Sequence, residues 1–597
     1  MTIKERLEEL RELMKREGTD AYLVPTDDFH CSEYVGDYFK CRQYITGFTG
    51  SAGTALVLSD MAGLWTDGRY FLQAEQQLAG SGIRLFRMGE PGVPSVNEFL
   101  EEHMKSGQCV GFDGRTMSAQ RAEQLKEKME QKGVKIRADE DLVGEIWIDR
   151  PQMSCEPVSE LALCLSGKSR EEKCIQIREA MKKEGADVFL LTSLEDIAWL
   201  LNIRGNDIHC CPVVLSYLMM TEDTITLFAG EKAFSDELRQ RLLFDGVQLK
   251  PYDQIYEAVK NIPAGSRVLL DKEQTNYRLV SILPEKVSVL DRQNLTLLPK
   301  AVKNPVEVEN IKKAHIKDGV AVTKFIYWLK KNVGKMPITE LSAAEHLYSL
   351  RSAQENFLGN SFDPIIAYGP HASVVHYSAT EATDVLLEPK GLLLADTGGH
   401  YLEGTTDITR TIALGELSYE QKKYFTAVLR GALLLADAKF VHGCTGMNLD
   451  HIAREPLWEL GKDFRHGTGH GVGYLLSVHE MPNSFRWRQI TGHSSSAVFE
   501  EGMVTSDEPG YYVDGEYGIR HENLIVCKKA EKTEYGQFMC FEHLTMVPFD
   551  LDAVLVEEMG EKERALLNAY HARVYEMISP YLEEEEKSWL REATGKI

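Results

Sequence analysis

The chain has 597 residues, of which 43% are hydrophobic and 26% charged, and its formal net charge is −24. This length predicts three or four domains of about 150 residues each, and the composition is typical of a folded soluble protein. Because nucleic-acid-binding proteins present basic surfaces to phosphates, the negative charge argues against that class.

The first residues, MTIKERLEELRELMKREGTDAY, are charged throughout and lack the apolar core of a signal peptide. No later stretch contains the roughly 18 uninterrupted apolar residues of a membrane span. The eleven cysteines are scattered without a C-x-x-C pair, which is typical of reduced thiols. We therefore expect a cytoplasmic protein with no membrane partner.

An internal repeat organises the first half of the chain. MKREGTDAYLV (14–24) recurs as MKKEGADVFLL (181–191), each time after an amphipathic helical stretch and before an apolar strand. The repeat predicts two related α/β domains, at 1–157 and 158–302. The alternative is that a common helix, glycine and strand sequence arose twice by chance.

A third domain is predicted over 303–597. Asn304 is a good N-cap, Pro305 suits the first helical turn, and Glu307 completes a capping box, so a helix is expected to start here. The following residues mix long helical patterns with short β-rich stretches, which predicts an α+β domain.

Two aspartates flank a glycine-rich turn in DTGGHYLEGTTDITRT (396–411). GLLLA before it and ITRTIAL after it are typical of strands, so a hairpin is expected. With the turn centred near Tyr401 and Leu402, Asp396 would lie directly opposite Asp407. Like charges in that position weaken a sheet, so the arrangement requires another reason.

Further metal-ligand side chains occur downstream. HGTGHGVGYLLSVHE (466–480) contains three histidines, VTSDEPGYY (504–512) contains Glu508, and GIRHENLIV (518–526) contains Glu522. Four carboxylates and one imidazole suit hard or borderline divalent ions, and two metals bridged by shared carboxylates would need about this many ligands. Such a pair of cations would turn the repulsion between the aspartates into attraction. Taken singly, each residue has a structural alternative, as a turn cap or a buried histidine.

The stretches LADTGGHYLEGTTDITRT, HGTGHGVGYLLSVHE, SDEPGYY and YGIRHENLIV together resemble the metal-binding motifs of the aminopeptidase P family, which belongs to the creatinase-like pita-bread metallopeptidases. Successive ligand positions are 11, 63, 38 and 14 residues apart. LVPTDDFHCSEY (23–34) and YITGFTGSAGTALVLSDMAGLWTDGRYFLQA (44–74) resemble the amino-terminal domain of the long, three-domain cytosolic type. The resemblance implies two creatinase-like α/β domains followed by a pita-bread catalytic domain with a C-terminal helical extension.

The resemblance also implies a site with two divalent ions, most often manganese. Its metal ligands would be Asp396, Asp407, His470, Glu508 and Glu522, with Asp407 and Glu522 shared by both ions. Glu508 would in addition be the general base.

Four further residues match family positions that act on the substrate or beside the metals. His376 and His479 would contact the substrate and the developing oxyanion, and His466 would lie near the proline pocket. Arg520 would steady the metal-site carboxylates and border the substrate.

The implied reaction is hydrolysis of the bond before a penultimate proline in small peptides, by a protein that is usually a homodimer. A prolidase shares the metal set but generally lacks one of the two amino-terminal domains, and a methionine aminopeptidase lacks the long amino-terminal half. The non-enzymatic alternative is a peptide-binding pita-bread protein, although such relatives have lost metal ligands that are all present here.

Three other histidines have no role implied by the family. His521 stands where long relatives more often have isoleucine, and strand alternation would direct its side chain away from Glu522. His371 and His493 are expected to be ordinary surface residues.

Overall fold

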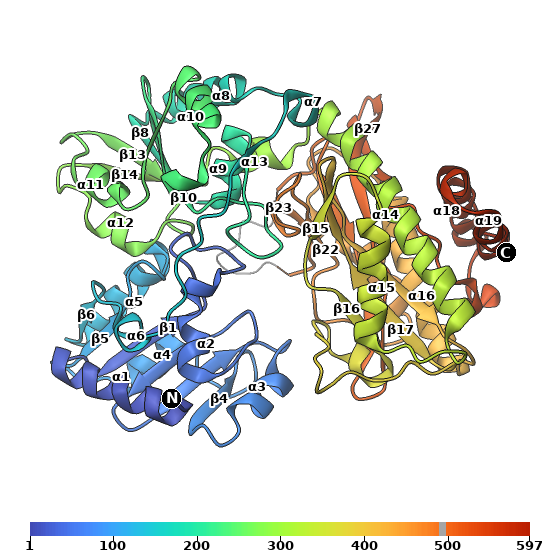
Figure 1. Ribbon diagram of the computed structural model, residues 1–597, viewed down its shortest axis with the longest axis horizontal. Coiled ribbons are helices and arrows are strands. Elements are labelled where there is room, and N and C mark those ends of the chain that lie inside the picture. The colour runs from blue at the N-terminus through green and yellow to red at the C-terminus, as the bar shows by residue number, and fades with distance from the viewer. Residues whose placement is uncertain (489–496) are drawn as a thin grey trace. The chain divides into compact units, whose positions relative to one another are not determined.

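The chain divides into two compact units (Figure 1). The computed structural model describes residues 1–488 and 497–597. The amino-terminal unit comprises Met1–Leu161 and Lys168–Thr296, and the carboxyl-terminal unit comprises Ala162–Gly167 and Leu297–Ile597. Among the described residues, no helix is both long and apolar enough to cross a bilayer.

The amino-terminal unit begins with a six-stranded sheet in the order β4-β3-β2-β1-β5-β6. Its strands are β1 (Ala21–Pro25), β2 (Thr54–Leu58), β3 (Ala62–Thr66), β4 (Ile83–Arg87), β5 (Cys109–Phe112) and β6 (Lys135–Arg137). The helices of this half are α1 (Ile3–Glu17), α2 (Cys41–Thr46), α3 (Phe71–Leu78), α4 (Val96–His103), α5 (Ala119–Gln131) and α6 (Leu142–Ile146).

The second half of this unit repeats the first sheet, in the order β12-β11-β10-β8-β13-β14. Its strands are β8 (Val188–Leu191), β10 (Ser216–Thr221), β11 (Ile225–Ala229), β12 (Val247–Pro251), β13 (Arg267–Leu270) and β14 (Ser288–Asp291), with β7 (Ser159–Glu160) and β9 (Ile203–Arg204) as a separate pair. The helices are α8 (Arg170–Glu184), α9 (Leu194–Leu201), α10 (Asp236–Phe244), α11 (Gln254–Lys260) and α12 (Tyr277–Ser281). The prediction of two related α/β folds is confirmed.

The repeated sequence motif has the same structural reason in both halves. Helices α1 and α8 each start with a capping box, and each ends at a glycine in the left-handed conformation, Gly18 with φ 67° and Gly185 with φ 71°. Only glycine adopts this conformation without strain, so the chain can turn there into β1 or β8.

In its described residues, the carboxyl-terminal unit has long helices and four sheets. Helix α14 (Pro305–Asn332) is capped by Asn304 and Glu307 as predicted. The other helices are α7 (Leu163–Ser166), α13 (Leu297–Ala301), α15 (Glu340–Ser352), α16 (Tyr419–Ala436), α17 (Gly446–Trp458), α18 (Glu561–Ile578) and α19 (Glu584–Ala593). The α+β prediction is therefore confirmed.

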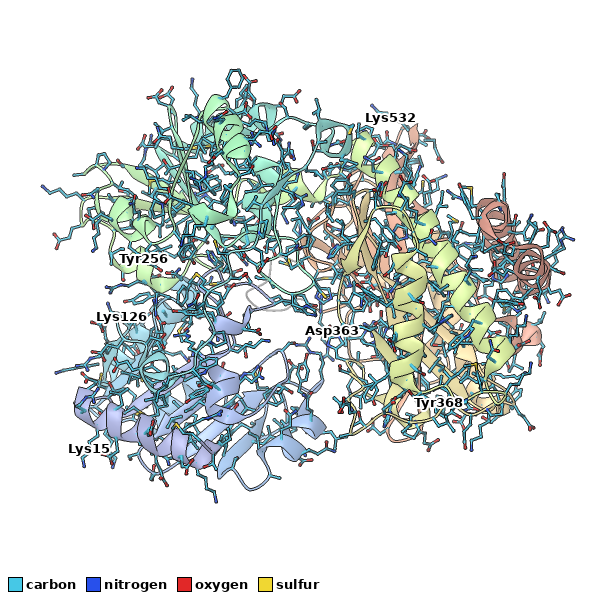
Figure 2. All side chains as sticks on the ribbon, in the orientation of Figure 1. Lys15, Lys126, Tyr256, Asp363, Tyr368 and Lys532 are labelled. Carbon is cyan, nitrogen blue, oxygen red and sulfur yellow. The ribbon has the colours of Figure 1, made fainter. Side chains whose placement is uncertain are left out.

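Three antiparallel strands form the sheet β16-β17-β20: β16 (Ile365–Tyr368), β17 (Leu392–Thr397) and β20 (Ile408–Ala413). The six-stranded sheet has the order β21-β28-β27-β24-β22-β23. Its strands are β21 (Lys439–Val441), β22 (Gly469–Gly471), β23 (Glu480–Phe485), β24 (Val504–Asp507), β27 (Asn523–Thr533) and β28 (Gly536–His543). The remaining strands are β15 (Phe357–Asn360), β18 (Gly399–Tyr401), β19 (Gly404–Thr405), β25 (Gly510–Val513) and β26 (Tyr517–Arg520). Figure 2 labels Tyr368, the last residue of β16, and Lys532, near the end of the β27–β28 hairpin.

Helices α14 and α15 cover the sheet β16-β17-β20 through a continuous apolar core. Phe325 and Leu329 of α14 and Leu347 of α15 belong to one buried cluster with Leu393 of β17 and Ile412 of β20. Burial of each such side chain contributes roughly 1.5–3 kcal/mol, so β17 and β20 are firmly held where they lead into the two aspartates.

The predicted register of the aspartate hairpin is wrong by two residues. Asp396 pairs with Thr409 and not with Asp407. A two-residue turn at Leu402 and Glu403 closes between Tyr401 and Gly404, and this turn sets the register of the whole hairpin. Residues 399–405 join a separate sheet, β15-β18-β19, so Asp407 lies just outside the paired strands.

Candidate active site

The five predicted metal ligands come from separate chain segments of the carboxyl-terminal unit. Asp396 is in β17, Asp407 immediately precedes β20, His470 is in β22, Glu508 follows β24, and Glu522 lies between β26 and β27. Backbone hydrogen bonds hold these segments together, from the Glu508 amide to the Thr468 carbonyl (2.8 Å) and from the Glu522 amide to the Thr409 carbonyl (3.0 Å). We call these five residues the carboxylate cluster.

The distances between their side chains show that the cluster residues form a single site. One possible ligand atom from each of Asp407, His470 and Glu522 lies within 4.8 Å of the others. His470 Nε2 is 3.5 Å from Asp407 Oδ2 and 3.4 Å from Glu508 Oε1. Asp396 joins the same site through charge, because it raises the pKa values of Asp407, Glu508 and Glu522.

The imidazole of His470 is oriented by the backbone carbonyl of the next residue, Gly471. Its Nδ1 lies 3.0 Å from the Gly471 carbonyl oxygen, and a carbonyl can only accept, so Nδ1 carries the proton and Nε2 faces the carboxylates. The Ser506 hydroxyl accepts from the His470 amide (3.0 Å) and donates to Glu508 Oε1 (3.2 Å). Such support is typical of metal-ligating histidines.

The cluster is largely buried, with Glu508 and His470 partly exposed, and it has an excess of negative charge. Burial, followed by the charges of Asp396 and Glu508, raises the pKa of Asp407 well above its usual range. Burial raises the pKa of Glu508 to about 7 although Arg520 opposes it, and burial with the charge of Asp407 raises the pKa of Glu522. These carboxylates therefore lack sufficient positive charge from the protein.

The donor set fits divalent cations. Asp396 Oδ1 is buried and has no hydrogen-bond partner among the described residues, although its other oxygen accepts from Arg520. A buried oxygen in this state is costly unless something else binds it. Carboxylate oxygens with one imidazole nitrogen are the ligands that hard or borderline divalent ions prefer.

Arg520 connects Asp396 to His466 through Tyr512. Arg520 Nη2 donates to Asp396 Oδ2, and Nη1 donates to the Tyr512 hydroxyl at 2.7 Å. That hydroxyl lies 2.9 Å from His466 Nε2, and His466 Nδ1 lies 2.7 Å from the Gly467 carbonyl. Burial lowers the pKa of His466 to about 3, so the imidazole is neutral and Nε2 accepts from Tyr512.

The other two predicted substrate residues lie beside this site. The ring of His479 is perpendicular to that of His470, with centroids 4.3 Å apart, and His479 lowers the pKa values of Asp407 and Glu508. His376 follows the short helix η3 (Gly369–Ser373) and is exposed. Its charge contributes to the low pKa of His466, so His376 lies within electrostatic range of His466.

Sequence reasoning missed two residues that organise the site. Tyr512 is in the SDEPGYY motif, four positions after Glu508, but no function was predicted for it. The Thr409 hydroxyl donates a hydrogen bond to Glu522 Oε2 at 2.7 Å and accepts one from Arg520 Nε at 3.4 Å. The position of Tyr512 within a metal-binding motif could have identified it, whereas a threonine in a β-rich stretch carries no such signal.

The remaining histidines lie apart from the cluster. His521 is fully buried with its ring 4.3 Å from that of Phe425, as expected for a side chain directed away from Glu522. His371 is partly exposed, as expected, and its Nδ1 lies 2.9 Å from Glu340 Oε1. His493 lies outside the described residues.

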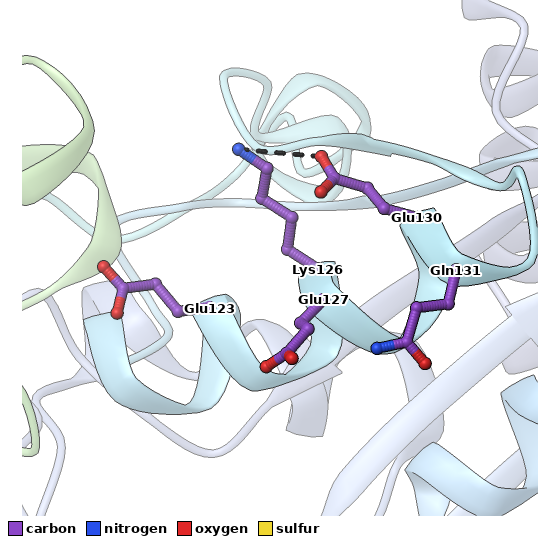
Figure 3. Close-up of a pocket in the computed structure, with 5 residues that line it drawn as sticks. All are labelled: Glu123, Lys126, Glu127, Glu130 and Gln131. Carbon is purple, nitrogen blue, oxygen red and sulfur yellow. Dashed lines mark ion pairs between the residues drawn. The ribbon is translucent and has the colours of Figure 1, made fainter.

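A hollow on α5 in the amino-terminal unit has a different character (Figure 3). Its lining residues are Glu123, Lys126, Glu127, Glu130 and Gln131. All come from one helix, and the ion pair drawn in Figure 3 joins Lys126 and Glu130 at 3.8 Å across exposed side chains. Exposed charges of this kind form a solvated helix face, so this hollow offers no chemistry like that of the carboxylate cluster.

Four family models match the chain in succession. Two models of the creatinase/prolidase N-terminal domain match residues 6–141 and 149–307. The model of metallopeptidase family M24 matches residues 309–529, and that of the C-terminal region of this peptidase family matches 537–597. The family M24 match contains all five residues of the carboxylate cluster.

Relatives and solved structures match across the whole length. The probable Xaa-Pro aminopeptidase P of Talaromyces marneffei is 38% identical over 99% of this chain and 92% of its own. Aminopeptidase P1 of Arabidopsis thaliana is 36% identical over 100% and 99%. The X-prolyl aminopeptidase of Caenorhabditis elegans, described as a cytosolic enzyme with a di-nuclear active site, has a TM-score of 0.94 and 34% identity over 100% of both chains.

A Xaa-Pro dipeptidase from Bacillus anthracis shares the fold over a shorter range. It covers 64% of this chain, with a TM-score of 0.51 and 24% identity. The whole-chain identity to the longer enzymes and the order of the family models agree with the site geometry. The chain therefore belongs to metallopeptidase family M24, in its aminopeptidase P group.

Proposed function

We propose that this protein is a metal-dependent Xaa-Pro aminopeptidase, which releases the first residue from peptides whose second residue is proline. The observation that carries this function is the carboxylate cluster, a set of four carboxylates and one imidazole that is largely buried and has excess negative charge. The whole-chain identity to Xaa-Pro aminopeptidases supports the substrate class.

We propose that the cluster holds two divalent ions, with Asp396, Asp407, His470, Glu508 and Glu522 as ligands and manganese as the metal. The di-nuclear site described for the C. elegans enzyme supports this number. Such a pair of ions polarises the bond under attack and lowers the pKa of a water toward about 7.

The protein residues then have separate roles. Glu508 takes the proton from the attacking water, as a carboxylate held between Ser506 and His470 can do. His479 and His376 contact the substrate and the oxygen that becomes negative. Arg520 holds Asp396 and, through Tyr512, orients His466 at the border of the proline pocket.

The substrate bond explains why a dedicated site is needed. The amide before proline has no N–H, so a peptidase cannot hold it through that donor. The alternative of a prolidase is less well supported, because the dipeptidase structure covers 64% of this chain whereas the C. elegans aminopeptidase covers all of it.

Three further features belong to the same proposal. The chain has domains at 1–157, 158–302 and 303–597, it forms a homodimer, and it works in the cytoplasm. The description of the C. elegans enzyme as cytosolic supports the location, and the two repeated sheets support the first domain boundary.

The test is hydrolysis of matched peptides by the metal-free protein after addition of manganese, zinc or cobalt, with and without chelator. A Xaa-Pro-Xaa tripeptide should be cleaved to a free amino acid and a Pro-Xaa dipeptide, and chelator should stop the reaction. Faster cleavage of a Xaa-Pro dipeptide would favour a prolidase. Failure to bind any of the three metals would contradict an enzymatic role.

A further inference from the structure

A second buried polar network contacts the residues next to Asp396 and Asp407. Asp318 of α14 and Arg351 of α15 are 0% and 1% exposed. Arg351 Nε donates to Asp318 Oδ1 at 2.6 Å, and its Nη2 donates to Oδ2 at 3.1 Å. The two long helices are thus joined by a bidentate ion pair with well-fitted geometry.

The same ion pair also holds a residue next to each aspartate. Arg351 Nη2 donates to the hydroxyl of Thr397, which follows Asp396, at 3.0 Å. The hydroxyl of Thr406, which precedes Asp407, donates to Asp318 Oδ2 at 2.5 Å. The Tyr401 hydroxyl, from the intervening hairpin, donates to Asp318 Oδ1 at 3.2 Å.

The backbone between the aspartates is closely packed at this point. A Cβ atom on Gly398 would lie 2.1 Å from the Thr406 carbonyl oxygen, so only glycine allows the two chain ends to come this near. The Thr406 hydroxyl also accepts from the Gly399 amide at 2.9 Å. The spacing of Asp396 and Asp407 therefore depends on contacts at residues 397–399 and 406.

Charge connects the network to the cluster as well. The negative charge of Asp407 is one of the causes that raise the pKa of Arg351. Arg351 and Asp407 therefore attract each other. A buried ion pair on its own is weak evidence for a gain in stability. What indicates a role for this pair is instead its contact with specific residues on both sides of the turn between Asp396 and Asp407.

We propose that Asp318 and Arg351 are positioning residues that set the spacing of Asp396 and Asp407 for metal binding, acting through Thr397 and Thr406. This inference rests on the proposed function, in which those aspartates are metal ligands. In this proposal, Asp318 of α14 and Arg351 of α15 hold the two aspartates in position in the metal-free protein, because supporting hydrogen bonds fix the orientation of metal ligands before the metal binds.

The test compares threonine variants by calorimetric titration of the metal-free protein with Mn²⁺. Thr406→Val removes the hydroxyl while keeping a similar shape, and Thr406→Ser restores it. The matched control is Thr426→Val in α16, because Thr426 is equally buried and its hydroxyl also makes two hydrogen bonds, to the Lys422 carbonyl (2.8 Å) and from the Leu555 amide (2.9 Å).

We expect Thr406→Val to weaken Mn²⁺ binding about 10- to 100-fold, to lower kcat on a Xaa-Pro-Xaa tripeptide, and to leave KM nearly unchanged. Thr406→Ser should bind Mn²⁺ like the wild type, and Thr426→Val should keep its affinity even if its melting temperature falls. Thr397→Val, at the other side of the network, should behave like Thr406→Val and replaces it if that variant does not fold.

Equal Mn²⁺ affinity in the wild type and the folded Thr406 or Thr397 valine variant would overturn the positioning role. An equal loss of affinity in Thr426→Val would overturn it too, because general destabilisation would then explain the effect. A wild type that binds no Mn²⁺ and cleaves no tripeptide would contradict the proposed function itself.

Discussion

The carboxylate cluster and the buried ion pairs near it belong to one unit but differ in how their charges are balanced. Asp318 pairs with Arg351, Asp450 with Arg454 at 2.6 Å, and Glu480 with both Lys300 and Lys303. In these pairs each carboxylate has a cationic partner. In the cluster, Arg520 and the histidines face four carboxylates, and the pKa values of Asp407, Glu508 and Glu522 are raised.

This difference separates structural charges from functional ones. A balanced buried pair supports a fold or a register and needs nothing else, and its disruption is destabilising. An unbalanced buried set is unfavourable by itself and favourable only with a cation bound. Asp407 and Glu522 of the cluster are 4% and 2% exposed and Glu480 of the paired group is 6% exposed, so burial alone does not distinguish the two kinds.

The largest effect is expected from Glu508→Gln, which keeps the shape of the side chain but cannot accept a proton. We expect kcat on a Xaa-Pro-Xaa tripeptide to fall about 10²- to 10⁴-fold, with the fold retained by circular dichroism. Glu516→Gln is the control, since Glu516 is an exposed glutamate in the neighbouring β25–β26 turn. Activity within threefold of the wild type would remove Glu508 from the proposed chemistry.

The buried carboxylates that have cationic partners should show the opposite behaviour, because their loss should reduce the stability of the protein more than its activity. Glu480→Gln removes the carboxylate that Lys300 and Lys303 both contact, and these two lysines are 5% and 3% exposed. Breaking a buried pair in this way costs about 3–5 kcal/mol, to be measured by urea unfolding of the metal-free protein. Adding Lys303→Met should recover part of the loss, and a cost below about 1 kcal/mol would contradict this assignment.

Removal of metal should destabilise the wild type but not a variant of the cluster. At a free Mn²⁺ concentration of 100 Kd, bound metal stabilises the folded protein by about 2.7 kcal/mol, and chelator should abolish this gain in a thermal melt. Asp407→Asn should be as stable as the metal-free wild type or more so, because it removes one of the mutually repelling carboxylates. A marked loss of stability in this metal-free variant would place Asp407 among the structural charges.

The smallest effect concerns a buried histidine outside the cluster. Burial lowers the pKa of His315 in α14 to about 4, from 6.5. As the pH falls, His315 is protonated in the unfolded chain before it is protonated in the folded protein. Its contribution to the free energy of unfolding is therefore fully present above pH 6.5 and is lost as the pH falls toward 4. The loss is about 2 kcal/mol at pH 5.

Urea unfolding at pH 7 and pH 5 tests this expectation against His315→Gln. The variant should lose less stability between the two pH values than the wild type does. His451→Gln in α17 is the control, since the side chain of His451 is 57% exposed. Identical pH dependence in the wild type and His315→Gln would show that His315 is not held in its neutral form.

Several features could be predicted from local sequence because local interactions decide them. The cap at Asn304 with Glu307, the glycine ends of α1 and α8, and the strands around the aspartates all depend on residues within a few positions of each other. The repeated motif also predicted two similar sheets, although their common strand order comes only from the structure.

The register of the aspartate hairpin could not be predicted in the same way. A turn centre that differs by one residue moves the pairing partner of Asp396 by two, from Asp407 to Thr409. The closure between Tyr401 and Gly404 decides the register, and it is supported by the contact of Tyr401 with Asp318, far away in sequence.

Residue type and spacing were enough to predict the fold class, the order of the ligand motifs and the class of metal that they suit. Which buried carboxylates have a cationic partner became known only from the folded arrangement. Asp318 lies among apolar residues of α14 and pairs with Arg351 of another helix, while Asp396 shares a site with Glu522 from a third segment. The pKa of a buried carboxylate depends on all charges within a few ångströms, and folding brings those charges together from distant parts of the chain.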